Sequence, residues 1–458
     1  MAQQVRRDAQ KPRSGDRSRS VIAPACPKGD EESLGREFVR DLLADSSPDV
    51  REHRVVVTFE DQGKQLRIRG RRGDDLRIGL RGVKTHPSYL ARRARQVRGC
   101  CQSVTLTVVR KRKVAVLGAT GTVGQRFISL LAGHPWFELA ALTTSERNAG
   151  RRYGDVTPWH FGEDMPAAIA DMRLEATRPD VDAEICFSAL PSEAAEQWES
   201  TLAKAGHHVF SNVKTHRMDE DVPLIIAEVN PEHANALELQ RRKRGWTGSI
   251  VTNGNCSAIT FTLAAAPLHR AFGIERVVVT TLQALSGAGY PGVPSLDALD
   301  NVVPFIGEEE EKMEQETKKF LGSWDGKVFK DAEFPFSAHC NRVSVRDGHT
   351  VTVSVALRGR PGVGDVTQAM RAFKGRPQEL GLPSAPKQPI VVRDERDRPQ
   401  PVRDRMAGNG MSVVVGRVRE DPVLGMKFVV LGHNTIRGAA GASVLNAELL
   451  AAEGCLGA

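Results

Sequence analysis

The sequence predicts an α/β fold in two parts: a doubly wound parallel sheet and, after it, an α+β domain with a mixed sheet. Three observations predict this class. Short apolar strands alternate with amphipathic helices over residues 113–255, which is typical of a parallel sheet. Longer strands with alternating Val and Thr follow over residues 256–431, as in a sheet with one covered face. The length of 458 residues, 40% of them apolar, suffices for two or three domains.

The first 112 residues differ from the rest in charge. Residues 1–113 contain 27 Lys and Arg against 14 Asp and Glu, whereas the rest of the chain contains 37 against 42. We expect a basic extension of unknown role, mostly disordered apart from a short helix at 34–43 and one or two β-hairpins over 51–82. The alternative of a nucleic-acid-binding arm is less favoured, because acidic residues are interspersed and aromatic residues that could stack on bases are scarce.

Composition argues against several classes of protein. The sequence has no apolar run of about eighteen residues or more, and its N-terminus lacks the apolar segment of a secretory signal. We therefore expect a cytoplasmic protein without a membrane span. The seven cysteines include no C-x-x-C pair, which argues against a disulfide framework and a zinc site, so we expect no metal.

A glycine-rich turn opens the first domain. Gly118, Gly121 and Gly124 lie between the strand V-A-V-L and an amphipathic helix. In this context backbone N–H groups and a helix N-terminus can hold a pyrophosphate, as in Rossmann-like dinucleotide-binding domains. We expect cofactor contacts from this turn and from two later polar residues: Gly118, Thr120, Gly121, Thr122, Val123, Gly124, Ser188 and Asn434.

The segment after the next strand indicates which dinucleotide binds. The strand E-L-A-A-L-T-T does not end in the Asp or Glu that binds a ribose 2′-hydroxyl. Instead Ser145, Arg147 and Arg151 follow, and a hydroxyl with guanidinium groups suits a 2′-phosphate. The sequence therefore favours NADP, although Glu146 keeps the NAD alternative open.

Cys256 is the candidate nucleophile. It lies in the segment T-N-G-N-C-S-A-I, between a predicted strand and a predicted helix, so we expect its sulfur near a helix N-terminus. That position lowers the pKa of a thiol and offers N–H groups to a developing oxyanion. The alternative, a small buried cysteine, fits Cys186 better, because Cys186 lies inside the apolar run C-F-S-A-L.

Two further residues flank a D-G turn. His349 follows the turn in C-N-R-V-S-V-R-D-G-H-T, and Arg342 precedes His349 by seven residues. An imidazole beside a thiol can act as acid and base, and a guanidinium can hold a carboxylate through two hydrogen bonds. Either residue alone would more often be a surface residue, so the prediction depends on their combination with Cys256.

Several longer motifs occur together in one order. They include V-A-V-L-G-A-T-G-T-V-G-Q-R-F, T-N-G-N-C-S-A-I, L-Q-A-L-S-G-A-G-Y-P-G-V, G-E-E-E-E-K-M-E-Q-E-T-K-K-F-L-G and H-N-T-I-R-G-A-A-G-A. From about residue 113 to the C-terminus the chain thereby resembles the aspartate-semialdehyde dehydrogenases, most closely their archaeal and fungal branch. It departs from that branch at Gly254, where the branch has Pro, and at Asn148, where it has Ser.

The resemblance implies a role for each residue of the site. These are Cys256 as nucleophile, His349 as acid/base, Gln283 orienting the substrate, Arg342 binding its carboxylate, Glu309 binding its ammonium, and Arg217, Lys312 and Asn255 around its phosphate. The charges are also reasonable without the family, because an acyl phosphate that is an amino acid needs cations for two anionic ends and an anion for its ammonium.

The resemblance also implies an activity and an assembly. The activity is the NADPH-dependent reductive dephosphorylation of L-4-aspartyl phosphate to L-aspartate 4-semialdehyde, in lysine, threonine and methionine biosynthesis, by a homodimer or homotetramer. One alternative is a malonyl-CoA or succinyl-CoA reductase on the same scaffold. Another is a dinucleotide-binding protein without turnover that binds nucleic acid through its basic arm.

The remaining segments complete the expected domain organisation. Residues 359–410 are interpreted as a helix at 364–374 and then a long connecting loop, because Pro, Gly, Arg and Asp are frequent there. A small-residue helix over about 432–458 is expected to complete the NADP-binding domain of residues 113–255. Residues 256–431 would form the catalytic and dimerisation domain.

Overall fold

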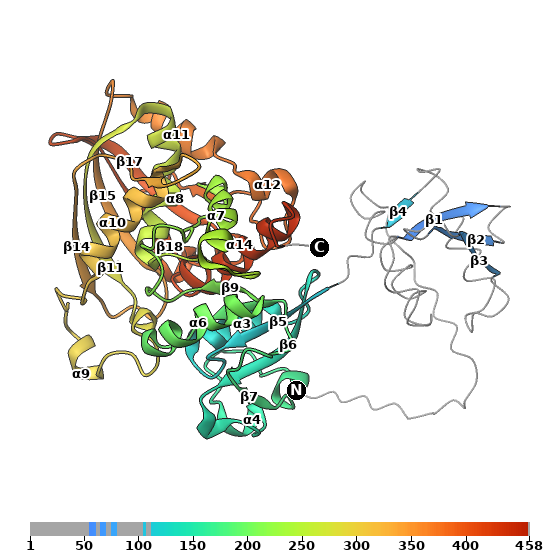
Figure 1. Ribbon diagram of the computed structural model, residues 1–458. Coiled ribbons are helices and arrows are strands. Elements are labelled where there is room, and N and C mark those ends of the chain that lie inside the picture. Colours follow the sequence, from blue (N-terminus) through green and yellow to red (C-terminus); the bar gives the residue numbers. More distant parts are fainter. Residues whose placement is uncertain (1–54, 61–64, 70–74, 80–103, 107–110, 457–458) are drawn as a thin grey trace, which may run out of the picture. The chain divides into compact units, whose positions relative to one another are not determined.

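The computed structural model describes residues 111–456 and, before them, four short strands at residues 55–60, 65–69, 75–79 and 104–106 (Figure 1). The chain divides into two compact units, Met1–Arg110 and Lys111–Ala458, and each is described by itself. The short helix expected at residues 34–43 lies outside the described residues.

The strands of the first unit form one antiparallel sheet. They are β1 (Val55–Glu60), β2 (Gln65–Arg69), β3 (Asp75–Gly79) and β4 (Val104–Leu106). Their order is β3-β2-β1-β4, and β2 pairs with both β1 and β3. The hairpins expected over residues 51–82 are therefore confirmed.

A six-stranded parallel sheet opens the second unit. Its strands are β5 (Arg112–Leu117), β6 (Phe137–Thr144), β7 (Leu174–Ala176), β8 (Ile185–Ser188), β9 (His208–Ser211) and β10 (Ser249–Thr252). Their order, β7-β6-β5-β8-β9-β10, is that of a Rossmann fold, and it confirms the doubly wound sheet. The winding reverses between β5 and β8, so the loops after these two strands flank the crevice in which such sheets bind ligands.

Helices and short turns connect these parallel strands. They are α3 (Thr122–Leu131), η4 (Glu146–Asn148), α4 (Tyr153–Val156), α5 (Ala167–Ala170), α6 (Ser192–Ala205), η5 (Pro231–Asn235) and α7 (Ala236–Arg244). Every residue of β8, β9 and β10 is buried, as expected for a parallel sheet that is covered on both faces.

A mixed sheet of six strands follows. Its strands are β11 (Ile274–Gln283), β14 (Phe336–Arg342), β15 (His349–Leu357), β16 (Ile390–Val392), β17 (Val413–Asp421) and β18 (Gly425–Gly432). Their order is β14-β11-β15-β18-β17-β16, with both parallel and antiparallel pairs. Every second side chain of β15 is buried, and the long helix α8 (Cys256–Phe272) packs into the same apolar core (Figure 1). The expected mixed sheet with one covered face is confirmed.

This second part contains further helices, one of which confirms the helix expected at residues 364–374. They are η6 (Leu285–Ala288), α9 (Ser295–Ala298), α10 (Glu309–Leu321), α11 (Val363–Ala372), α12 (Arg376–Leu380), α13 (Pro401–Asp404) and η7 (Ala407–Gly410), with a small hairpin of β12 (Ser323–Trp324) and β13 (Phe329–Lys330). The long loop expected after α11 therefore contains two α-helices, a 3₁₀ turn and a strand. Pro377 and Pro401 stand in the first turns of α12 and α13, where proline favours a helix rather than a loop.

The C-terminal helix begins later than expected. β18 extends to Gly432, a π-helical turn η8 (Ile436–Ala440) follows, and α14 (Gly441–Ala452) starts only there. Val444 and Leu445 of α14 pack in the same apolar core as Phe127 of α3. The last helix of the chain thus returns to the parallel sheet.

The described residues contain neither a membrane-spanning helix nor a cluster of metal ligands. No helix among them has the length and apolar character needed to cross a membrane. Within the same residues, no group of three or more His, Cys, Asp and Glu side chains is placed to hold a metal ion.

Candidate active site

The turn between β10 and α8 positions Cys256. Asn255 is the N-cap residue, and its Oδ1 accepts hydrogen bonds from the backbone N–H groups of Ser257 (2.9 Å) and Ala258 (3.0 Å). These bonds satisfy two N–H groups of the first turn and leave Cys256 as the first residue of the helix, half-buried. The structure thus places the sulfur at a helix N-terminus.

Three neighbouring strand ends bring Gln283, Arg342 and His349 together. β11 lies between β14 and β15, with Gln283 opposite Arg342 in the parallel pair and Leu282 opposite Thr350 in the antiparallel pair. Gln283, Arg342 and His349 are all buried. Strand register therefore brings Gln283 to Arg342 and His349, which follow it by 59 and 66 positions, as counted from their numbers.

The hydrogen bonding of His349 determines its tautomer. The backbone N–H of Ala284 donates to Nδ1 at 3.0 Å, so Nδ1 holds a lone pair and the proton of the neutral ring is on Nε2. Burial, together with the charge of Arg342, lowers the pKa of His349 to about 3. Nε2 is buried without a partner among the described residues, so it can donate a proton to a bound ligand.

The backbone at Gly287 lies against both His349 and Arg342. A Cβ atom at this position would come within 2.9 Å of Arg342 Nη1 and 3.1 Å of His349 Nε2. Arg342 Nη1 also donates to the carbonyl oxygen of Ala284 at 2.8 Å. The loop after β11 therefore holds the guanidinium and the imidazole side by side.

Glu309 links two other predicted residues to this group. Its Oε2 accepts hydrogen bonds from Asn255 Nδ2 (2.8 Å) and Gln283 Nε2 (3.1 Å). Lys312 Nζ lies 3.6 Å from the other carboxylate oxygen. The first turn of α10 thus faces the N-terminus of α8.

Arg217 is held by a residue that the sequence did not indicate. Its Nη1 donates to Glu316 Oε1 at 2.8 Å, and its Nη2 donates to the carbonyl oxygen of Asn212 at 2.8 Å. Glu316 lies seven residues after Glu309 on the same helix face, which was the one available signal. Among the acidic residues at the start of this helix, the sequence predicted a role for Glu309 alone.

The pKa of the Cys256 thiol is raised, opposite to the lowering expected from a helix N-terminus. Burial, with the nearby charge of Glu309, raises the pKa to about 12. Arg217, Arg342 and the N–H of Ser257 act in the opposite direction but do not outweigh burial. Burial therefore outweighs the helix N-terminus in setting the pKa of this thiol.

The glycine turn fits a dinucleotide. A Cβ at Gly118 would lie 2.6 Å from the carbonyl oxygen of Ala189, and Gly118 has a φ of +73°, so only glycine suits this approach of the loops after β5 and β8. Thr122 Oγ1 and Ser188 Oγ are buried without hydrogen-bond partners in the part of the chain that the structure describes. Thr122 is the first residue of α3 and Ser188 the last residue of β8, so both hydroxyls lie at the strand ends that flank the crevice, where they could bind a pyrophosphate or ribose, although Ser188 also lies beside the buried Glu199. Thr120 and Gly121 lie in the same turn, Val123 packs against the core, and Gly124 packs on the carbonyl oxygen of Gly118.

The loop after β6 offers free cations. Ser145, Arg147 and Arg151 are exposed, and neither arginine has an acidic partner among the described residues. Arg152, in contrast, is paired with Asp171. These two guanidinium groups are therefore available to an anion, and their role at a 2′-phosphate stays a prediction.

Asn434, a predicted cofactor contact, lies next to His349 in the chain's fold. Its Oδ1 accepts a hydrogen bond from the N–H of Gly348 and its Nδ2 donates to Ser286 Oγ, both at 2.8 Å, so it connects two loops beside His349. A cavity of about 490 Å³ lies next to it, between the glycine turn and the mixed sheet. The sequence reasoning missed most of its lining, including Arg126, His160, Ser286, Tyr290, Arg346 and Thr435.

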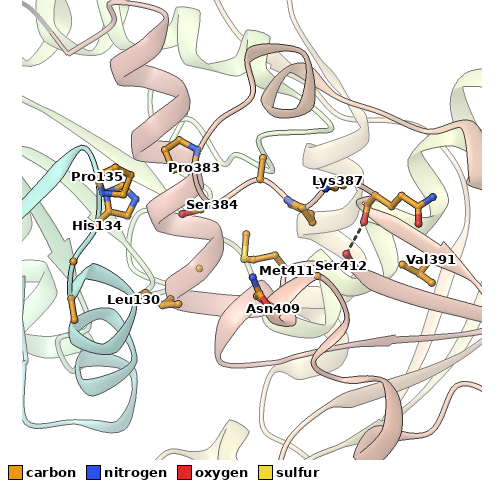
Figure 2. Close-up of a pocket in the computed structure, with 17 residues that line it drawn as sticks. Leu130, His134, Pro135, Pro383, Ser384, Lys387, Val391, Asn409, Met411 and Ser412 are labelled. Carbon is orange, nitrogen blue, oxygen red and sulfur yellow. Dashed lines mark hydrogen bonds between the residues drawn. The ribbon is translucent and has the colours of Figure 1, made fainter. Parts of the chain in front are cut away.

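A larger cavity of about 870 Å³ lies elsewhere (Figure 2). Figure 2 shows the Ser412 hydroxyl directed at the carbonyl oxygen of Gln388, to which it donates at 2.6 Å. His134 and Ser384, also in its wall, bind the buried carboxylate of Glu448. Its lining includes none of the predicted site residues, so we do not assign the chemistry to it.

Comparisons with known proteins agree with this geometry. Residues 113–237 match the family model "Semialdehyde dehydrogenase, NAD binding domain", and residues 265–437 match "Semialdehyde dehydrogenase, dimerisation domain". The aspartate-semialdehyde dehydrogenase of Methanothermobacter thermautotrophicus is 53% identical over 341 residues, which cover 74% of this chain and 98% of the relative. That of Cryptococcus neoformans is 48% identical over 358 residues, which cover 75% and 98%.

A solved structure has the same fold over the same part of the chain. The aspartate-semialdehyde dehydrogenase of Candida albicans, crystallised with NADP, is 43% identical and has a TM-score of 0.70. The match covers 76% of this chain and 100% of that one. The chain therefore belongs to the aspartate-semialdehyde dehydrogenase family of oxidoreductases.

Proposed function

We propose that the chain catalyses the NADPH-dependent reductive dephosphorylation of L-4-aspartyl phosphate to L-aspartate 4-semialdehyde, a step of amino-acid biosynthesis. The observation that carries the proposal is the set of charges around Cys256. Arg217 and Lys312 can bind the phosphate, Arg342 the α-carboxylate and Glu309 the ammonium. This set of charges matches those of the substrate.

The covalent step belongs to Cys256. Its thiolate attacks the acyl carbon, the bond from that carbon to the phosphate oxygen breaks, and inorganic phosphate leaves beside Arg217 and Lys312. The substrate ammonium, bound to Glu309, offsets the negative charge that helps to raise the pKa of the thiol. Substrate binding thus favours the thiolate that the ligand-free site disfavours.

His349 donates a hydrogen bond to the oxygen of the reacting carbonyl. Its Nε2–H is the only proton that the neutral ring can offer, because Nδ1 accepts from the backbone. We assign this N–H to the oxygen on which negative charge develops. Gln283, hydrogen-bonded to Glu309, orients the bound substrate.

The cofactor site is formed by the glycine turn and the loop after β6. Gly118, Gly121 and Gly124 with the Thr122 and Ser188 hydroxyls would hold the dinucleotide, whose nicotinamide supplies a hydride when it is bound. Ser145, Arg147 and Arg151 would hold the 2′-phosphate.

The decisive assay runs in the reverse direction, with aspartate semialdehyde, NADP and inorganic phosphate. We expect NADPH to form only when phosphate is present. Oxidation that requires coenzyme A instead, or reduction of malonyl-CoA or succinyl-CoA, would replace the proposal with an acyl-CoA reductase.

Cofactor preference is tested by the change Arg147→Leu. Losing one charge-assisted hydrogen bond of roughly 1.5 to 3 kcal/mol should weaken NADPH binding about ten- to a hundredfold, with little effect on NADH. Titration with both cofactors measures this. Arg152→Leu is the control. Because Arg152 is paired with Asp171, this variant should leave the cofactor preference unchanged.

Two other results would argue against Arg147 as the phosphate ligand. Equal losses for NADPH and NADH would mean that Arg147 supports its loop, and Arg151 would become the better candidate. Unchanged affinities for both cofactors would contradict the NADP assignment. Glu146 would then become the candidate ligand of the ribose.

Removal of residues 1–110 should leave activity and thermal stability unchanged. The relatives match over 98% of their own length, and the family models match only residues after 112. Circular dichroism, thermal unfolding and the phosphate-dependent assay check this. A truncated chain that fails to fold would make the extension a structural part of the enzyme.

The matched dimerisation domain indicates a homo-oligomer, and we propose a homodimer or homotetramer. We likewise propose that residues 113–255 with the C-terminal helix bind NADP and that residues 256–431 form the catalytic and dimerisation domain. The cytoplasmic location remains a prediction.

A further inference from the structure

The helix α10 presents four charged residues along one face. Glu309, Lys312, Glu316 and Lys319 follow one another at spacings of three and four residues, so they lie on one stripe. The first two face the N-terminus of α8, as described above. The second two lie against the segment that carries Arg217, and the proposed activity assigns them no role.

Glu316 contacts two parts of the site at once. Its Oε1 accepts a hydrogen bond from Arg217 Nη1 at 2.8 Å, and its Oε2 accepts one from the backbone N–H of Asn255 at 2.5 Å. The side chain of Glu316 is only 3% exposed and that of Arg217 only 9%, so water does not replace these bonds easily. One carboxylate thus joins the phosphate-binding arginine to the residue before the nucleophile.

Both partners of Glu316 are hydrogen-bond donors. A carboxylate can accept from the two of them, whereas an amide has one accepting oxygen and one donating nitrogen. A glutamine at this position would therefore satisfy either Arg217 or Asn255, and its NH₂ group would face the other donor. The interaction requires a carboxylate.

The surroundings leave Glu316 little freedom. A Cβ at Gly254 would come within 2.9 Å of Glu316 Oε2 and 2.4 Å of Phe320 Cζ, so the turn before Cys256 packs directly on α10. One helical turn further, Lys319 Nζ donates to the carbonyl oxygens of Arg217 (2.7 Å) and Val222 (3.2 Å). The helix α10 thus holds the Arg217 segment at two points.

We propose that Glu316 is a positioning residue that couples phosphate binding by Arg217 to the placement of the Cys256 turn. The proposal rests on the assignment of Arg217 to the phosphate. Glu316 does not touch the substrate itself. It sets the direction of the guanidinium and the position of Asn255 at the same time.

The test compares Glu316→Gln with Glu314→Gln, the same change two residues earlier, at a side chain with no hydrogen bond or ion pair among the described residues. We expect the KM for phosphate to rise roughly ten- to a hundredfold in Glu316→Gln, with the KM for aspartate semialdehyde within about threefold. A general loss of structure would raise both. Glu314→Gln should match the wild type.

A second readout does not require turnover. The readout is the rate at which iodoacetamide alkylates Cys256. Inorganic phosphate bound beside the thiol should slow this reaction. The phosphate concentration that halves the alkylation rate should rise about tenfold or more in Glu316→Gln. If that variant does not fold, Glu316→Asp, which keeps both acceptors on a shorter side chain, should give the same shift to a smaller degree.

The outcomes separate the two proposals. Equal phosphate protection of wild type and Glu316→Gln would overturn the role of Glu316 and leave the phosphate site in place. No protection in the wild type would overturn the assignment of Arg217 and, with it, the role of Glu316.

Discussion

Replacement of Cys256 by Ala should abolish reduction of the acyl phosphate and leave NADPH binding nearly intact. The covalent step needs a sulfur at the first residue of α8, and none of the cofactor-binding groups proposed here depends on that sulfur. We expect a loss in kcat of roughly a thousandfold or more. Phosphate-dependent turnover and a separate NADPH titration measure the two effects.

The control for this variant is Cys455→Ala. Cys455 is a half-buried free thiol after α14, so its removal should not affect turnover. Cys256→Ser should be nearly as inactive as Cys256→Ala, because a hydroxyl does not become anionic near neutral pH. Activity of Cys256→Ala within tenfold of the wild type would refute the assignment of the nucleophile.

The largest effect on stability is expected for Glu228→Gln. Glu228 and Arg437 form two hydrogen bonds of 2.8 and 2.6 Å, and both side chains are completely buried. Removal of one charge leaves the other buried without compensation, which costs about 3–5 kcal/mol. Denaturant-induced and thermal unfolding measure the change.

A matched surface pair shows whether burial is the cause. Arg371 and Asp394 also form two hydrogen bonds, of 2.6 and 2.7 Å, but their side chains are 43% and 83% exposed. Asp394→Asn should therefore change the free energy of unfolding by no more than about 1 kcal/mol. Equal losses in the two variants would mean that Glu228 contributes no more than a surface ion pair.

The parts of the molecule that the sequence predicted are those with local signals. Buried strands, the glycine turn and the strand-to-helix position of Cys256 each depend on a few adjacent residues. The α12 and α13 helices were missed because proline marks both loops and helix starts. The C-terminal helix was extended too far because the small residues 438–440 of the π-helical turn continue without a break into α14.

The contacts within the site could not be predicted in the same way. Glu316 is one of several acidic residues on α10, and only the folded chain shows that it meets both Arg217 and Asn255. The pKa of Cys256 likewise depends on burial and on Glu309, which is 53 residues away in the sequence, as counted from their numbers. Motifs therefore located the chemistry, and the tertiary packing determined its electrostatics.

The absence of a side chain at Gly287 limits how this enzyme could be redesigned. A Cβ there would come within 2.9 Å of Arg342 Nη1 and 3.1 Å of His349 Nε2, the two groups proposed to bind the substrate carboxylate and the reacting oxygen. A mutagenesis library that varies this position would therefore force the Arg342 guanidinium and the His349 ring to shift in every variant. Close approach of the backbone at Gly287 thus makes this position a poor starting point for a change of specificity.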